Sequence, residues 1–127
     1  MQALFWIFGV VNVANGLWML LAPESWYQYL PAAVPDTGPL NVHFVRDIGA
    51  AFTTVGVAFC VAARQPAWQR GVLGMATVFN VLHAIVHVTD MLSGRLHHDH
   101  WLIDLPLVFL PAFFLIVLCL PRWWRAR

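Results

Sequence analysis

Four polar residues recur at regular spacing in the segment N-V-L-H-A-I-V-H-V-T-D: Asn80, His83, His87 and Asp90. On a helix, which turns by about 100° per residue, these positions fall within one narrow stripe. The rest of the segment is apolar and long enough to cross a bilayer, where ionisable side chains are costly and mostly functional. The spacing therefore predicts a buried polar site on one face of a membrane helix.

Imidazole and carboxylate side chains together form a ligand set for copper, zinc or iron. Two histidines one helical turn apart can bind a single ion from one helix face, so His83 and His87 are the first predicted ligands. We expect His43 and Asp90 to complete the set. Residues that orient a ligand or balance its charge are expected at Asn80, Asp47, Asp104 and Arg46.

Other uses of these residues stay open. Haem b could be bound by His43 and one third-helix histidine, although His43 lies shallower and no C-x-x-C-H motif is present. A proton relay is disfavoured because the cytoplasmic half of the third helix is apolar. A purely structural interpretation pairs Asp47 and Asp90 with Arg46. A zincin site is excluded because Ala84 occupies the position of the general base in H-E-x-x-H.

The composition is that of a membrane protein. The 127 residues are 61% hydrophobic and 10% charged, whereas a soluble domain carries about 25% charged residues. A proline-rich loop at 23–40 is expected at the outer interface. Four windows are long enough to cross the hydrocarbon core as helices, at about 3–22, 43–63, 71–92 and 101–120. The sequence thus predicts an all-α fold, a single membrane domain (1–127) built as an antiparallel four-helix bundle.

The arginines set the predicted orientation. Arg64 and Arg70 flank the turn between the second and third helices, and the tail R-W-W-R-A-R holds Arg122, Arg125 and Arg127. By the positive-inside rule these segments face the cytoplasm of a bacterial inner membrane, with both termini inside. The first helix is expected to be retained because it lacks a basic n-region and a small-x-small cleavage site. The polar site then lies near the periplasmic face, beside an H-H-D-H segment (97–100) expected to be an exposed loop.

Two stretches carry a family resemblance: G-P-L-N-V-H-F-V-R-D-I-G (38–49) and L-H-A-I-V-H (82–87). Together with L-L-A-P-E-S-W-Y after the first helix, they resemble a family of small bacterial four-helix membrane proteins, uncharacterised and similar to the DoxX-like group. The resemblance implies the architecture and a shared polar site. It implies no activity, because no residue here carries over the thiosulfate and quinone chemistry of some DoxX-like proteins. The matching positions are Asn41, His43, Arg46, Asp47, Gly49, His83 and His87.

The sequence therefore predicts an integral membrane protein that binds a transition metal ion near the periplasmic face. No catalytic residue is assigned. One alternative is a non-catalytic accessory subunit of a larger membrane complex, since the chain is small and has no room for a soluble domain. Another is a membrane oxidoreductase that holds haem b or quinone. The expected partners are the lipid bilayer and other subunits of such a complex, and nothing in the composition suggests nucleic-acid binding.

Overall fold

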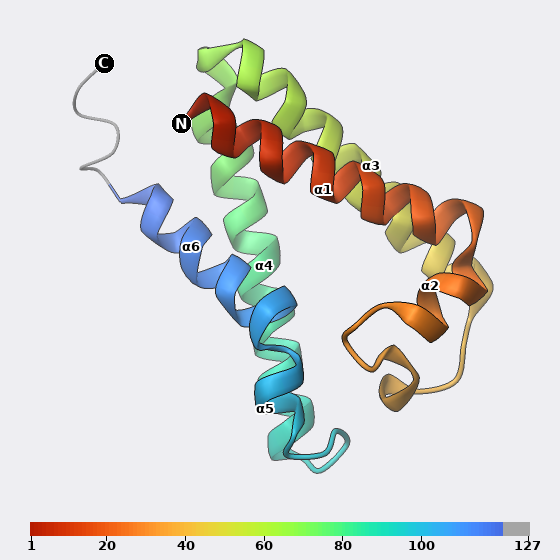
Figure 1. Cartoon of the computed structure of the whole chain (residues 1–127). Coiled ribbons are helices and arrows are strands. Elements are labelled where there is room, and N and C mark those ends of the chain that lie inside the picture. Colours follow the sequence, from red (N-terminus) through yellow and green to blue (C-terminus); the bar gives the residue numbers. More distant parts are fainter. Residues whose placement is uncertain (121–127) are drawn as a thin grey trace. The chain divides into compact units, whose positions relative to one another are not determined.

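The computed structural model describes residues 1–120, which fold into helices and their connections without any strand (Figure 1). This confirms the predicted all-α class. The tail at 121–127, to which the sequence assigns part of the positive charge, lies outside the described residues. In chain order the elements are α1 (Gln2–Leu21), α2 (Pro23–Tyr29), η1 (Val34–Thr37), α3 (Val42–Arg64), η2 (Pro66–Trp68), α4 (Gln69–Leu92), α5 (His100–Ile103), η3 (Leu105–Phe109) and α6 (Leu110–Cys119).

Three helical segments are long and apolar enough to cross a membrane: Gln2–Leu21, Val42–Arg64 and Pro66–Leu92. They correspond to the first three predicted windows. The fourth window, 101–120, is not one continuous helix, because it is divided into α5, the π-helical turn η3 and α6. Its longest apolar helical part is Leu105–Cys119.

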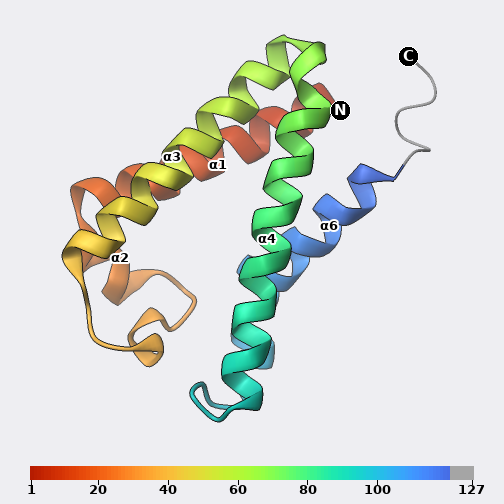
Figure 2. The same cartoon turned by 180° about the vertical axis from the view of Figure 1, so that it is seen from behind.

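The chain divides into two compact units, Met1–Val72 and Leu73–Arg127. In the first unit, α1 and α3 run antiparallel and approach closely at two pairs of glycines (Figures 1 and 2). Gly9 lies against Gly56, and Gly16 against Gly49, so that a methyl group at Gly16 would come within 2.6 Å of the Gly49 carbonyl oxygen. Small residues at such a contact let two membrane helices pack backbone against backbone.

The segment after α1 is held back against that helix by aromatic side chains. The indole N–H of Trp26 in α2 donates to Asn15 Oδ1 at 2.9 Å, and that of Trp18 in α1 donates to Ser25 Oγ at 3.2 Å. The Tyr27 hydroxyl closes the following loop by donating to the Gly38 carbonyl oxygen at 2.8 Å. The predicted outer loop is therefore a folded, hydrogen-bonded segment.

In the second unit, the C-terminal helices run antiparallel to α4. Thr77 lies near the start of α4 and its Oγ1 is 3.2 Å from Cys119 Sγ, near the end of α6. His87, near the other end of α4, contacts Asp104 at the start of η3. Several apolar side chains of these helices are buried, namely Leu73, Ala76, Met91, Val108, Ala112 and Leu115.

The break at Asp104 has a local cause. Pro106 and Pro111 have no amide hydrogen, so a regular ladder of hydrogen bonds cannot continue through this stretch. The Asp104 carbonyl oxygen accepts from the amides of both Val108 (2.8 Å) and Phe109 (3.2 Å), which widens the turn into a π-helix. Turns of this kind are frequent at functional sites.

Candidate functional site

Two imidazoles lie one turn apart on α4. The ring centroids of His83 and His87 are 4.6 Å apart, and the rings meet edge to face at 74°. His83 also stacks on Phe79, one turn earlier, with centroids 5.9 Å apart and ring planes inclined by only 5°. The four-residue spacing thus places both histidines on one side of the helix, as the sequence predicts.

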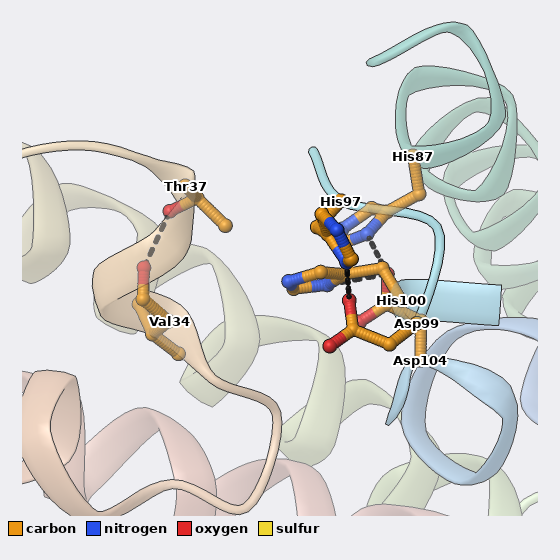
Figure 3. Close-up of polar contacts among 7 residues, drawn as sticks. All are labelled: Val34, Thr37, His87, His97, Asp99, His100 and Asp104. Carbon is orange, nitrogen blue, oxygen red and sulfur yellow. Dashed lines mark hydrogen bonds and ion pairs between the residues drawn. The ribbon is translucent and has the colours of Figure 1, made fainter. Parts of the chain in front are cut away.

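His87 is held by a carboxylate from the C-terminal segment. Its Nδ1 lies 2.7 Å from Oδ2 of Asp104 (Figure 3). The Asp104 side chain is fully buried and that of His87 is 16% exposed. A buried carboxylate is unfavourable unless hydrogen-bond donors satisfy it, so this contact stabilises Asp104 in its buried position.

A second imidazole reaches the same oxygen. Nδ1 of His100 lies 3.3 Å from Oδ2 of Asp104, and both side chains are fully buried (Figure 3). The expectation that residues 97–100 form an exposed loop is therefore wrong for His100. The four-residue spacing between His100 and Asp104 is the signal that could have revealed it, because it places both on one face of a helical turn.

The other oxygen of Asp104 is different. Oδ1 is buried and has no hydrogen-bond partner within residues 1–120. The carboxylate is therefore held through Oδ2 alone, by the two imidazoles.

The remaining loop residues are exposed, as expected. Nδ1 of His97 lies 3.0 Å from Asp99 Oδ1, and both side chains, like that of His98, face solvent. The hydrogen bond from His97 lowers the pKa of the Asp99 carboxyl from its ordinary value.

Three of the predicted site residues belong to the first unit. Nε2 of His43 lies 3.4 Å from Oδ2 of Asp47, with side chains 90% and 63% exposed. Arg46 does not pair with either carboxylate named in the structural interpretation, since its Nε donates to the Leu20 carbonyl oxygen at 3.0 Å. This contact satisfies a carbonyl at the C-terminal end of α1, where a positive charge is also favourable. The roles of the three residues at a metal site stay predictions.

The two other predicted residues, Asp90 and Asn80, lie on α4. Asp90 Oδ1 accepts from Arg95 at 3.2 Å, and its carbonyl oxygen accepts from the amides of Arg95 and Leu96, which closes the loop after α4. Asn80 donates its side-chain amide to the Ala76 carbonyl oxygen at 2.9 Å, within the same helix. Their predicted roles beside the histidines also stay predictions.

Across residues 1–120, no group of three or more His, Cys, Asp or Glu side chains is arranged to hold a metal ion. What the second unit does bring together is a pair of neighbouring imidazoles, one of them fixed by a buried carboxylate. Such an arrangement can present ring nitrogens to an ion or exchange protons with a ligand.

A comparison with protein families identifies the chain. The sequence model of one family, described as a domain of unknown function (DUF4345), matches residues 1–117. The protein therefore belongs to that uncharacterised family. No curated protein and no solved structure matched the chain.

Proposed function

We propose that the protein is a four-span protein of the bacterial inner membrane that binds a transition metal ion through His83 and His87, near its outer face. The observation that supports this most directly is the 2.7 Å contact between Nδ1 of His87 and the buried carboxylate of Asp104. Histidines that bind metals commonly donate their second ring N–H to a carboxylate, which fixes the orientation of the ring and makes it a stronger ligand.

The contact with Asp104 also determines which ring nitrogen of His87 is available to a metal ion. An ionised carboxylate has no proton and only accepts hydrogen bonds, so Nδ1 of His87 is the protonated nitrogen. In a neutral ring the lone pair is then on Nε2, which is the atom available to an ion. His83 presents a second imidazole 4.6 Å away between ring centroids, held in place by its stacking on Phe79.

The chemistry of the ligands narrows the choice of ion. Imidazole suits copper, zinc and iron, whereas magnesium and calcium prefer sites made of oxygen atoms. Two protein ligands leave coordination positions for further groups, for which Asp90, at the next position of the stripe, remains the proposed candidate. Haem b, with one of these two imidazoles as an iron ligand, is the alternative cofactor.

The test is the metal content of the full-length protein purified in detergent from metal-replete cells. We expect roughly one copper, zinc or iron ion per chain in the wild type, and loss of most of it in His83→Ala and in His87→Ala. His98→Ala is the matched control, because it removes an exposed imidazole from the loop outside the pair.

Metal-free wild-type protein would contradict the proposal. So would equal metal content in His87→Ala and His98→Ala. If the metal-free protein instead co-purified with a larger membrane complex, and assembly survived both α4 substitutions, the accessory-subunit alternative would replace it.

A further inference from the structure

His100 is a fully buried imidazole at the first position of α5. Its backbone carbonyl oxygen accepts from the Asp104 amide at 3.0 Å, so one helical turn fixes the two residues relative to each other. Its Nδ1 lies 3.3 Å from Asp104 Oδ2, the oxygen that also contacts His87 (Figure 3). Burial of a polar ring is unfavourable unless it is hydrogen-bonded, and the contact with Asp104 contributes to the stability of the buried His100 ring.

From this geometry we propose that His100 is a positioning residue, which holds Asp104 so that Oδ2 faces His87. Both imidazoles approach one carboxylate oxygen with Nδ1, and each must donate its N–H because the carboxylate only accepts. His100 thereby keeps His87 in the tautomer whose lone pair is on Nε2. The link to metal binding rests on the proposed function, whereas the effect on the tautomer of His87 does not.

The second carboxylate oxygen of Asp104, Oδ1, is the reason why the contact from His100 matters. Since Oδ1 of Asp104 has no hydrogen-bond partner in the described part of the chain, the carboxylate is oriented by the two imidazoles at Oδ2, and His100 is the one besides His87. Without His100, one of the two donors at Oδ2 is gone, and the carboxylate can turn to orientations in which neither oxygen stays at hydrogen-bond distance from Nδ1 of His87. His87 would then lose its fixed acceptor and populate both neutral tautomers.

The experiment is ¹⁵N NMR of the histidine rings in the full-length, metal-free protein in lipid nanodiscs. We expect the wild type to show His87 protonated on Nδ1 alone, and His100→Ala to show a mixture of both tautomers. His100→Asn places an amide N–H close to the position of Nδ1 and should restore the wild-type pattern. His100→Gln places its amide farther out and should not, and it replaces the alanine variant if that variant does not fold.

An unchanged tautomer of His87 in His100→Ala or His100→Gln would overturn the proposal, as would a wild-type His87 protonated on Nε2. Metal affinity gives the second measurement. We expect a loss of about tenfold in His100→Gln, at the lower end of what residues behind a ligand contribute, and recovery in His100→Asn. Because the NMR needs no metal, a metal-free wild type would refute the proposed function alone. Normal metal binding with an unchanged tautomer in His100→Gln would refute only the role of His100.

Discussion

The burial of the Asp104 carboxylate carries a desolvation penalty. Other interactions in the second unit must offset this loss of stability. The Asp104 carboxyl group is fully buried, and within residues 1–120 only one of its oxygens is hydrogen-bonded. An apolar residue of similar size would avoid the desolvation penalty if the two imidazoles were apolar as well. A carboxylate kept in such a place, between two histidines, is better explained by what it does to them than by stability.

Replacing Asp104 alone should therefore destabilise the protein. In Asp104→Leu, the Nδ1–H groups of His87 and His100 lose their acceptor in a buried environment. We expect the free energy of unfolding to fall by about 1–3 kcal/mol, the usual effect of leaving buried donors unsatisfied. The measurement is the apparent melting temperature of the detergent-purified protein.

Asp99→Leu is the matched control, because that side chain is exposed and should leave the melting temperature nearly unchanged. Replacing Asp104, His87 and His100 together by apolar residues should recover much of the stability, since no buried donor remains. If Asp104→Leu melted at the wild-type temperature, the contacts at Oδ2 would contribute nothing to stability.

The α4 histidines of this site could be predicted from the sequence, whereas the burial of His100 could not, for a physical reason. Periodicity places His83 and His87 on one face of α4 because both belong to one regular helix. Asp104, on another predicted helix, was also expected among the residues that orient a ligand or balance its charge. The contact between Asp104 and His87 depends on how two helices pack, and periodicity within either one does not specify it. His100 was missed because the letters H-H-D-H suggest a solvated loop, although the first turn of α5 begins inside it.

At the scale of elements, the close packing of α1 on α3 follows from glycine placement. The glycines are seven residues apart in both helices, at 9 and 16 and at 49 and 56, so two successive contacts fall in register along an antiparallel pair. Larger side chains at these positions would force the helices apart. The neighbouring Cys60 and Thr53 fill the remaining space next to the glycines.

Gly16→Ala should destabilise this helix pair. The added Cβ would lie 2.5 Å from the Thr53 amide nitrogen and 2.6 Å from the Gly49 carbonyl oxygen, both backbone atoms that cannot move without shifting α3. We expect a loss of about 1–3 kcal/mol, as for other overpacked cores, measured as unfolding in detergent. In Gly74→Ala the new methyl group meets no atom within 4 Å, so that variant should be unchanged or slightly more stable. Equal stability of both variants would contradict the close contact.

The apolar runs of the sequence predict the bounds of the first three long helices but not the break in the window 101–120. The first three spans were predicted to within a few residues, because long apolar runs bounded by proline, glycine and polar residues leave few alternatives. The window 101–120 is equally apolar, and a kink was expected at Pro111. The structure breaks earlier, at Asp104, because Pro106 and Pro111 together remove two amide donors and the backbone adopts a π-turn.

At the scale of the whole molecule, the distribution of charges predicts how the chain is oriented across a membrane. Arg64 and Arg70 flank η2, whereas the loop between α4 and α5 carries Arg95 together with Asp99 and two histidines. Lys and Arg counted in short loops set the orientation of a membrane protein, and acidic residues contribute little. The turn at 65–68 is thus expected in the cytoplasm and the 93–99 loop outside.

Labelling of single cysteines in intact cells tests this orientation. In a background with Cys60→Ser and Cys119→Ser, Ser93→Cys should react with a membrane-impermeant maleimide, because the 93–99 loop would be periplasmic. Ala67→Cys, exposed in η2, should react only after the inner membrane is permeabilised. A green fluorescent protein fused after Arg127 should fluoresce, since it folds in the cytoplasm, where four spans would place the C-terminus. Labelling of Ala67→Cys in intact cells would reverse the orientation, and a dark fusion beside correctly labelled cysteines would show that the segment from Leu105 to Cys119 does not cross the bilayer.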